Sequence, residues 1–290
     1  MKPPKFEYFA PETLAEATAL LAEHGDDAKI LAGGQSLMPM LNMRMVRPQV
    51  LVDLNGVADL GGVEQHLGGG LTIGALTRQR ELERSPVVRE AAPVISAAMP
   101  YLGHFQIRNR GTIGGSLSHA DPAAELPALC TALDAQFVLT SSSGERTVPA
   151  RDFFVTDLTT ALEAQEILTQ VRIPPPVDGS SWGFYEVCRR EGDFALAGAV
   201  CMVHLDASGT CQDARIILFG VGAAPVRADA GAGALIGTKP DAASLQKAAD
   251  AVSQELEPPG DIHASTQYRK EVGGVVVRRA LAQALEGHSQ

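Results

Sequence analysis

Two short glycine-containing segments of the same design constrain this chain more than any other feature. "LAGGQSL" covers residues 31–37 and "TIGGSL" covers residues 112–117; each places Gly-Gly after an apolar step and before a small polar residue. A glycine pair lets successive backbone N–H groups turn toward one point and form an anion-binding concavity. A helix that begins after such a segment adds the positive partial charge of its N-terminus. Two such surfaces facing each other suit a ligand with two adjoining phosphates.

The composition of these segments narrows the class of ligand. Neither segment contains a lysine, so the donors would be amides and hydroxyls. A nucleoside triphosphate site usually recruits Lys and magnesium, and the pattern therefore favours a tightly held cofactor. The alternative is that each glycine pair only ends a strand or permits a bulge.

Other nucleotide-binding and metal-binding motifs are missing or incomplete. "GVGAAP" at 220–225 has Pro in place of the third glycine of a dinucleotide fingerprint, and "GAGALIG" at 231–237 has no convincing strand before it. His119, Asp121 and Glu125 lie close together in sequence, but carboxylates and a single histidine beside a proline are more typical of caps and turns than of a metal site. We predict no metal site and no catalytic side chain.

Charge and cysteine content exclude several classes of partner. The 290 residues carry a formal net charge of −10, which argues against nucleic acid or an anionic membrane as the main partner. The longest apolar runs, such as "FALAGAVCMV", are too short for a membrane span, and the N-terminal segment lacks the apolar core of a signal peptide. The four cysteines show no CxxC spacing. We expect reduced core thiols in a cytoplasmic protein, and no iron–sulfur ligands.

Apolar periodicity indicates alternating helices and strands followed by a second, smaller domain. Thr77 is expected to cap a helix that follows it. The predicted elements are helices at 11–25, 241–257 and 266–285, strands at 28–34, 49–55 and 70–76, a hairpin at 136–149 and a three-stranded meander within 182–222. "PPPVDGSS" at 174–181 is the best linker candidate.

The two glycine motifs also carry a resemblance to a known family. "AGGQSLMPMLNMRMVRPQVLVDLN" and "QIRNRGTIGGSLSHADPAAELPA" closely resemble the FAD-binding medium subunit of molybdenum hydroxylases, the group of aerobic carbon monoxide dehydrogenase and xanthine dehydrogenase. "VCRREGDFALAG" resembles the C-terminal domain of the same subunit, so that the resemblance covers nearly the whole chain. It implies an α+β fold. An FAD-binding domain of the vanillyl-alcohol-oxidase (PCMH) type would cover residues 1–176, with subdomains at about 1–57 and 58–176. A C-terminal α/β domain of the carbon monoxide dehydrogenase flavoprotein type, with a three-stranded antiparallel sheet and helices, would cover 177–290.

The resemblance further implies which residues contact the cofactor. Leu102 would be an apolar contact, Glu125 would bond the adenosine ribose, and Leu168 would offer a backbone contact. Leu102 and Leu168 could equally be core residues, and Glu125 could be a helix cap. The two glycine segments would hold the pyrophosphate from opposite sides through Ile30, Leu31, Ala32, Gly33, Gly34, Gln35, Ser36 and Leu37 in the first, and Thr112, Ile113, Gly114, Gly115 and Ser116 in the second.

One position departs from the xanthine dehydrogenase-like pattern. Those members carry a lysine near the flavin, and alignment on the "RREGDFA" run puts Tyr185 in its place, with Glu186 beside it. We include Tyr185 among the expected cofactor contacts. A lysine there would stabilise the anionic reduced flavin. Its replacement leaves the flavin potential and the electron acceptor open, and NAD reduction is not carried over.

The resemblance implies an electron-transfer function. In family members, substrate oxidation at a molybdopterin in a large subunit supplies electrons to 2Fe–2S clusters on a small subunit. The clusters pass these electrons to FAD on the medium subunit, and FAD passes them to quinone, oxygen, NAD or another acceptor. We therefore expect an FAD-carrying subunit of a heterotrimer, paired as a dimer of heterotrimers. A stand-alone FAD-dependent reductase or oxidase, and a flavin-free scaffold subunit, are the alternatives. The substrate of the complex is left open, because it would bind to another chain.

Overall fold

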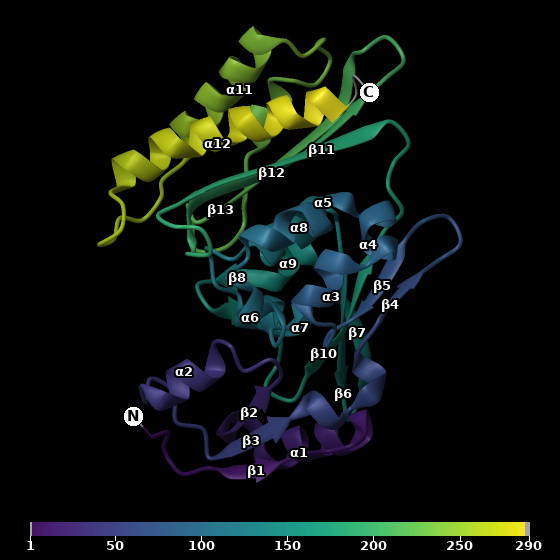
Figure 1. The fold of residues 1–290 in the computed structure, drawn as a ribbon, viewed down its shortest axis with the longest axis vertical. Coiled ribbons are helices and arrows are strands. Elements are labelled where there is room, and N and C mark those ends of the chain that lie inside the picture. The colour runs from purple at the N-terminus through teal and green to yellow at the C-terminus, as the bar shows by residue number, and fades with distance from the viewer. Residues whose placement is uncertain (1, 288–290) are drawn as a thin grey trace.

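The three larger of the four sheets in the described chain follow one another along its longest axis (Figure 1). The structure is a computed structural model, and it describes residues 2–287. A small parallel sheet lies at the N-terminal end, a five-stranded antiparallel sheet lies in the middle, and a four-stranded antiparallel sheet with long helices lies at the C-terminal end. We call these the N-terminal, middle and C-terminal parts.

The N-terminal part is a parallel sheet covered by one helix. Its strand order is β1-β3-β2, with both outer strands parallel to the central one. Thr13 begins the covering helix through a capping box with Glu16, and Ala17 and Leu21 of that helix are buried against the sheet. The elements are β1 (Glu7–Phe9), α1 (Leu14–His24), β2 (Ala28–Leu31), α2 (Leu37–Asn42) and β3 (Val50–Asp53), with short 3-10 turns at Gly25–Asp27, Leu54–Gly56 and Ala58–Leu60.

The middle part is an antiparallel sheet with strand order β4-β5-β10-β6-β7. Its strands are β4 (Val63–Gln65), β5 (Leu71–Gly74), β6 (Gln136–Ser141), β7 (Gly144–Pro149) and β10 (Ile167–Ile173), and a separate ribbon joins β8 (Phe154–Thr156) to β9 (Thr159–Thr160). Its helices are α3 (Gln79–Arg84), α4 (Pro86–Ala91), α5 (Pro93–Ala98), α6 (Phe105–Arg108), α7 (Ile113–His119), α8 (Glu125–Ala132) and α9 (Ala150–Phe153), with a 3-10 turn at Met99–Tyr101. The predicted hairpin at 136–149 is β6 and β7.

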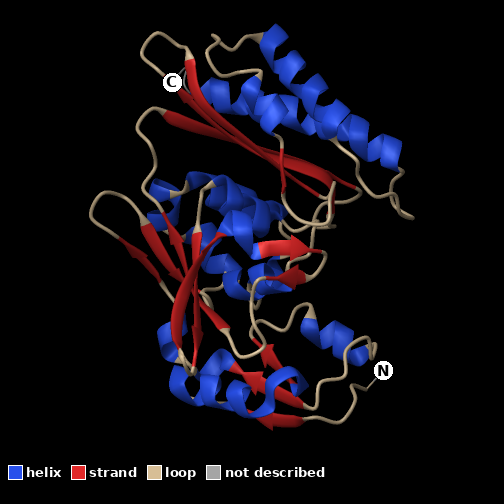
Figure 2. Cartoon of the chain, turned by 180° about the vertical axis from the view of Figure 1, so that it is seen from behind, coloured by secondary structure: helices blue, strands red, loops and turns tan. Residues whose placement is uncertain are grey.

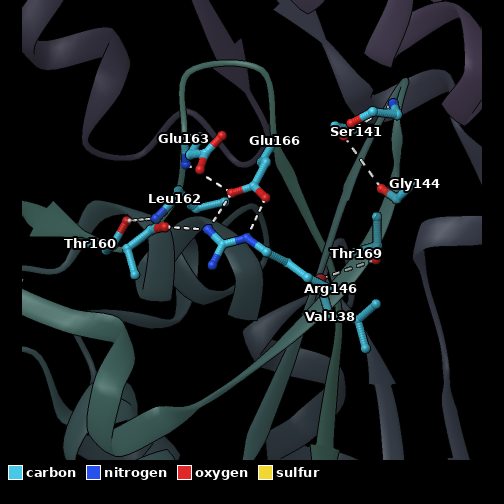
Figure 3. Close-up of polar contacts among 11 residues, drawn as sticks. Val138, Ser141, Gly144, Arg146, Thr160, Leu162, Glu163, Glu166 and Thr169 are labelled. Carbon is cyan, nitrogen blue, oxygen red and sulfur yellow. Dashed lines mark hydrogen bonds and ion pairs between the residues drawn. The ribbon is translucent and has the colours of Figure 1, made fainter.

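An arginine–carboxylate pair fastens the loop that leads into the central strand of this sheet (Figure 3). The Arg146 guanidinium on β7 donates to both carboxylate oxygens of Glu166, at 2.6 and 2.7 Å, and to the Ala161 carbonyl oxygen at 2.6 Å. The N–H of Glu163 donates to the same carboxylate at 2.9 Å. Burial opposes ionisation of Glu166, yet these bonds hold its pKa below the usual range. The loop thereby enters β10 in one orientation.

The C-terminal part is an antiparallel sheet with strand order β11-β12-β13-β14. Its elements are β11 (Ser180–Cys188), β12 (Ala195–Leu205), β13 (Cys211–Phe219), β14 (Val226–Arg227), α10 (Asp229–Gly233), α11 (Ala242–Glu255) and α12 (Thr266–Gly287). Figure 2 shows α11 and α12 lying together over one face of the sheet. The expectation of three strands missed β14, because a two-residue strand leaves no periodic signal in the sequence.

The two faces of the C-terminal sheet belong to different cores. Successive residues of a strand point to opposite faces, so that Phe184, Val200, Ile217 and Phe219 join the core of the middle part, whereas Ala199, Cys201, Ile216 and Leu218 pack with α11 and α12. The N-terminal part has a separate core. The middle part and the C-terminal sheet are therefore joined by apolar packing, although the chain links them only through residues 174–179.

Residues 2–287 contain no helix long and apolar enough to cross a membrane, and no group of three or more His, Cys, Asp or Glu side chains that could hold a metal ion. Cys130, Cys188, Cys201 and Cys211 are all free, and burial raises the pKa of Cys130 to about 12. Cys130, Cys201 and Cys211 are therefore buried core thiols, whereas Cys188 is only partly buried.

β11 and α12 cross closely at Gly183, so a substitution of this residue tests how the helix packs on the sheet. A Cβ atom added to Gly183 would overlap the carbonyl oxygen of Ala280 on α12. Because both groups are backbone, we expect Gly183→Ala to push α12 from the sheet and to lower the free energy of unfolding by about 1–3 kcal/mol. Urea unfolding followed by circular dichroism measures this loss. Gly233→Ala on α10, where no atom lies within 4 Å, is the matched control and should be neutral or slightly stabilising. Equal losses in both variants would contradict this account of the crossing.

Candidate functional site

The two glycine segments meet although they come from different parts of the chain. The first follows β2 in the N-terminal part, and the second begins α7 in the middle part. A Cβ atom added to Gly33 would lie 2.5 Å from the carbonyl oxygen of Arg110 and 2.8 Å from the Cα of Gly111. A Cβ atom added to Gly115 would lie 3.7 Å from the Cβ of Ala32. The segments are thus packed backbone against backbone, a closeness that only glycine permits at position 33.

Two polar side chains tie the segments together. The Asn55 side-chain amide donates to the carbonyl oxygen of Ala32 at 2.8 Å, and Arg78 donates to the Asn55 side-chain oxygen at 2.7 Å. Arg78 also donates to the Arg110 carbonyl oxygen at 2.5 Å and forms a backbone bridge with Thr112. Burial and the charge of Arg110 lower the pKa of Arg78. The sequence analysis missed both side chains; the available signal for Asn55 was a polar residue at the carboxyl end of a buried parallel strand.

The first segment offers a row of unused amide donors. Within residues 2–287, the backbone N–H groups of Gly33, Gly34, Gln35 and Ser36 have no protein acceptor. Gly34 has a φ of +73°, which side chains other than glycine rarely adopt, and the Gln35 side chain donates back to the Gly33 carbonyl oxygen at 3.0 Å. This backbone forms the anion-binding surface that the glycine pair predicts.

The second segment differs from the first, and the expectation of two equivalent amide surfaces is corrected. Thr112 is the N-cap of α7, so the glycine pair lies inside the first helical turn rather than in a loop before the helix. The backbone N–H groups of Ile113, Gly114, Gly115 and Ser116 donate to Thr77 O, Ala75 O, Thr112 Oγ1 and Thr112 O at 3.1, 2.8, 3.1 and 3.1 Å. These amides are already used. What the segment supplies is close backbone approach and the partly exposed Ser116.

Leu102 is a core residue whose backbone is held by a buried arginine. Its side chain is 8% exposed and belongs to the core of the middle part. Arg108 donates to the carbonyl oxygens of Leu102 and Gly103 at 3.1 and 2.6 Å, and pairs with Glu83 at 2.9 Å. Arg108 therefore holds the turn before α6 in place. The buried Leu102 side chain agrees with the alternative that Leu102 is a core residue, although it lies next to an exposed turn.

Leu168 lies at a bulge that connects the sheet to the second segment. The register between β10 and β6 shifts between Leu168 and Gln170. The carbonyl oxygen of Thr169 accepts from the Ala75 N–H at 2.9 Å, and the carbonyl oxygen of Ala75 accepts from Gly114. A continuous chain of backbone hydrogen bonds thus runs from this bulge to the start of α7. The Leu168 side chain itself is core.

The Tyr185 side chain packs on the α11–α12 side of β11, and its expected contact with the cofactor stays a prediction. The Tyr185 ring packs with the α11–α12 core, its hydroxyl accepts a hydrogen bond from Arg279, and the Arg279 guanidinium lies 4.8 Å from the ring centroid. Phe184 and Glu186 alternate with it on β11, and Phe184 joins the core of the middle part. Glu186 is therefore on the same face of β11 as Phe184, the face turned toward the middle part.

Glu125 and Glu186 are two buried carboxyl groups whose pKa values are raised. Glu125 is the first residue of α8 and is 4% exposed, and Glu186 is 8% exposed. Burial raises the pKa of Glu125 to about 7, opposed by a bond from its own backbone N–H, and Asp121 raises it further. Burial and the charge of Glu125 raise the pKa of Glu186 to about 8. Neither carboxyl oxygen of Glu186 has a hydrogen-bond partner in the described part of the chain.

The turn between β11 and β12 brings the C-terminal part to the same region. A Cβ atom added to Gly192 would lie 2.8 Å from the ring of His104, in the turn that follows Leu102. The Gly220 N–H donates to the Pro122 carbonyl oxygen at 2.8 Å, between the second segment and α8. Phe194, which the sequence analysis did not consider, follows that turn and is 62% exposed. The C-terminal part therefore contacts the turn after Leu102 and the segment that precedes α8.

Fold and site together define the class of protein. The chain has an anion-binding backbone segment without a Rossmann fingerprint, packed against a second glycine segment, and it ends in an antiparallel C-terminal part. Residues 4–176 match the family model described as "FAD binding domain in molybdopterin dehydrogenase", and residues 182–284 match "CO dehydrogenase flavoprotein C-terminal domain". The chain belongs to this family of FAD-binding dehydrogenase subunits, which confirms the resemblance; its cofactor is FAD, and it is an oxidoreductase subunit.

Curated relatives and solved structures of the family resemble the chain over almost its full length. It is 43% identical to the alpha subunit of the 6-hydroxypseudooxynicotine dehydrogenase complex of Paenarthrobacter nicotinovorans, over 98% of this chain and 96% of the relative. It is 39% identical to the carbon monoxide dehydrogenase medium chain of Hydrogenophaga pseudoflava, over 97% of each chain. Among solved structures, quinoline 2-oxidoreductase from Pseudomonas putida 86 aligns with a TM-score of 0.95 at 38% identity over 100% of both chains.

The contact at Gly33 predicts the effect of a single methyl group on cofactor binding. Gly33→Ala would drive a Cβ atom into the Arg110–Gly111 backbone and separate the two segments. We expect FAD affinity to fall by about tenfold or more, equivalent to ~1.4 kcal/mol, measured as the dissociation constant of FAD from the purified chain. Gly34→Val and Gly115→Val should also lower occupancy without unfolding the C-terminal part.

Gly61→Ala is the matched control for these variants. It lies in the same region of the chain, and the nearest atom to its added Cβ would be 3.9 Å away. We expect FAD binding like that of the unaltered chain. Full flavin occupancy in Gly33→Ala, Gly34→Val and Gly115→Val would contradict the assignment of the glycine segments to the cofactor.

Proposed function

We propose that this chain is the FAD-carrying electron-transfer subunit of a cytoplasmic molybdenum-containing hydroxylase or dehydrogenase. It takes electrons from 2Fe–2S clusters of a small partner subunit and passes them to an external acceptor. A large molybdopterin subunit oxidises the substrate, and the complex is a dimer of heterotrimers. The observation that carries this proposal is the contact of the two glycine segments beside unused backbone amides of residues 33–36.

The residues of the site fit the diphosphate of FAD. A diphosphate is an acceptor-rich dianion, and the free N–H groups of residues 33–36 are donors that the described protein leaves unpaired. Gly115 lets a ligand approach α7 closely, with Ser116 as an additional hydroxyl donor. Ile30, Leu31, Ala32, Leu37, Thr112, Ile113, Gly114 and the backbones of Leu102 and Leu168 complete the proposed boundary of the site. We place the border between FAD-binding and C-terminal domains at residue 176, within the linker.

The chain's own residues bind and orient the cofactor and carry out no bond-making step. Bound FAD supplies the redox chemistry, accepting electrons one at a time and releasing them in pairs. Asn55 and Arg78 hold the segments at a fixed separation, and Arg108 holds the turn at Leu102. The buried apolar residues of the middle part exclude water from one side of the site. No catalytic side chain is required for an electron relay.

The electron donor must come from another polypeptide. The four cysteines are dispersed through the described chain, and three are buried, so they do not form a cluster-binding set. Relatives are named as a subunit of a dehydrogenase complex or as a medium chain, which supports assembly with other chains. The relatives' names refer to carbon monoxide, caffeine and nicotine, and this variety supports a substrate site outside the FAD subunit.

A reconstitution experiment tests the proposal. The FAD-loaded chain is mixed anaerobically with its small 2Fe–2S subunit, reduced beforehand with dithionite and freed of excess reductant. We expect the flavin absorbance to fall while the cluster absorbance returns to the oxidised form, because electrons pass from cluster to flavin. Gly33→Ala should abolish the transfer by removing the flavin, whereas Gly61→Ala should not.

The same experiment separates the alternatives. A chain that purifies without flavin and cannot be loaded with FAD would refute an electron-transfer role. An FAD-loaded chain that stays oxidised beside the reduced small subunit, and that turns over a small substrate alone, would instead establish a stand-alone reductase or oxidase.

A further inference from the structure

We propose that a cleft between the middle part and the C-terminal sheet binds an uncharged, planar ring compound with carbonyl oxygens, a molecule of the quinone class. The cleft has a volume of about 490 Å³, and no residue of either glycine segment lines it. The inference goes beyond the proposed function, and its test does not need FAD. The lining residues are Ala97, Tyr101, Ser180, Ser181, Trp182, Phe184 and Gln283.

The cleft lies where two parts of the chain meet. α5 of the middle part lies beside β11, which is an edge strand of the C-terminal sheet (Figure 1). At this edge the Phe184 N–H donates to the Gln283 side-chain oxygen of α12 at 3.0 Å, so that α12 closes one side. Small-molecule sites are common at such junctions, and their volumes are about 300–1,000 Å³. The cleft is therefore large enough for a small ring compound.

Three aromatic side chains form the apolar surface of the cleft. Phe184 is 4% exposed, and its ring centroid lies 5.2 Å from that of Tyr101 and 5.9 Å from that of Phe219. Trp182 lies two residues earlier on the same face of β11 and packs against the core of the middle part. Tyr101 is 44% exposed. Because aromatic rings pack best with other rings, face to face with an offset or edge to face, this surface favours a planar ring ligand.

The unused polar groups of the cleft are hydrogen-bond donors. The oxygen of the Gln283 side chain already accepts from the Phe184 N–H, which leaves the NH₂ group. Within residues 2–287, this NH₂ group, the Trp182 indole N–H and the Tyr101 hydroxyl have no hydrogen-bond partner. An indole N–H and an amide NH₂ only donate. A matching ligand therefore carries acceptors at its edge, as a quinone does in its carbonyl oxygens.

The charge of the lining selects against ionised ligands. Among the described residues, the seven that line the cleft are all uncharged at neutral pH. A phosphate or carboxylate that entered would lose part of its hydration without meeting a cation, which is costly. The cleft therefore favours a neutral quinone over a nucleotide or an organic acid.

Trp182 is the only tryptophan of the chain, so its fluorescence reports on the cleft. The emission of the purified, oxidised protein is recorded while 2,3-dimethyl-1,4-naphthoquinone is added; this quinone has no open ring position to which a cysteine thiol adds. We expect quenching that saturates, because a bound quinone contacts the indole ring. The same additions to N-acetyltryptophanamide correct for absorption and for quenching by collision.

A second quinone tests the charge selection on the same unaltered protein. 2-Hydroxy-3-methyl-1,4-naphthoquinone has nearly the same size and shape, but it is an anion at neutral pH. We expect its dissociation constant to be about tenfold higher or more, because the lining offers no cation to replace its hydration.

Two substitutions test the location of the bound quinone and the role of the donor. Ala97→Leu fills the cleft from the exposed side of α5, and Gln283→Glu keeps an oxygen for the Phe184 N–H but replaces the NH₂ donor with a negative charge. Each should weaken binding by about tenfold or more. Ala19→Leu is the matched control, because Ala19 is an exposed alanine within α1, and its quenching curve should follow the unaltered protein.

The outcomes are distinct. Quenching of the unaltered protein that stays linear would overturn the proposal, and so would equally tight binding of the ionised quinone. Unchanged binding in Ala97→Leu would place the quinone elsewhere and also refute it. If a variant fails to fold by circular dichroism, the two quinones on the unaltered protein still decide. Failure of the chain to bind FAD would refute the proposed function and would leave this titration unaffected.

Discussion

The contact of Gly33 with the Arg110–Gly111 backbone is the interaction on which the site depends. It joins two parts of the chain with separate cores and leaves no room for a side chain between them. Apolar packing alone would not set the distance between two loops at this precision, because loops bury little surface. Asn55 and Arg78 set it instead through hydrogen bonds to backbone carbonyl oxygens, which have a defined direction.

The two glycine segments show how one sequence pattern yields two conformations. In the first, the glycines precede α2, and the backbone N–H groups remain free. In the second, Thr112 caps the helix before the glycines are reached, so the same residues enter the helix and their N–H groups are used. The neighbouring strand decides the difference, because the carbonyl oxygen of Ala75 lies within reach of Gly114. One segment can donate to an anion, and the other provides space beside it.

Local periodicity predicted the long elements well and the site less completely. The expected helices at 241–257 and 266–285 are α11 and α12, whose apolar faces repeat over several turns. Thr77 was expected to cap a helix, but its hydroxyl donates to the Gly62 carbonyl oxygen, a partner that no local pattern reveals. Contacts between segments that are distant in the chain, such as that of Asn55 with Ala32, also cannot be predicted from a single sequence.

The packing of the C-terminal sheet ties a domain that does not contain the glycine segments to the part that carries the second of them. One face of β11, β12 and β13 completes the core of the middle part, so Glu186 is held by the same packing that holds the helices around the site. A hinged domain could rotate a buried carboxyl group into water and ionise it at little cost. A domain fixed by a shared core cannot, and the charge of Glu186 must be settled by a proton where it stands.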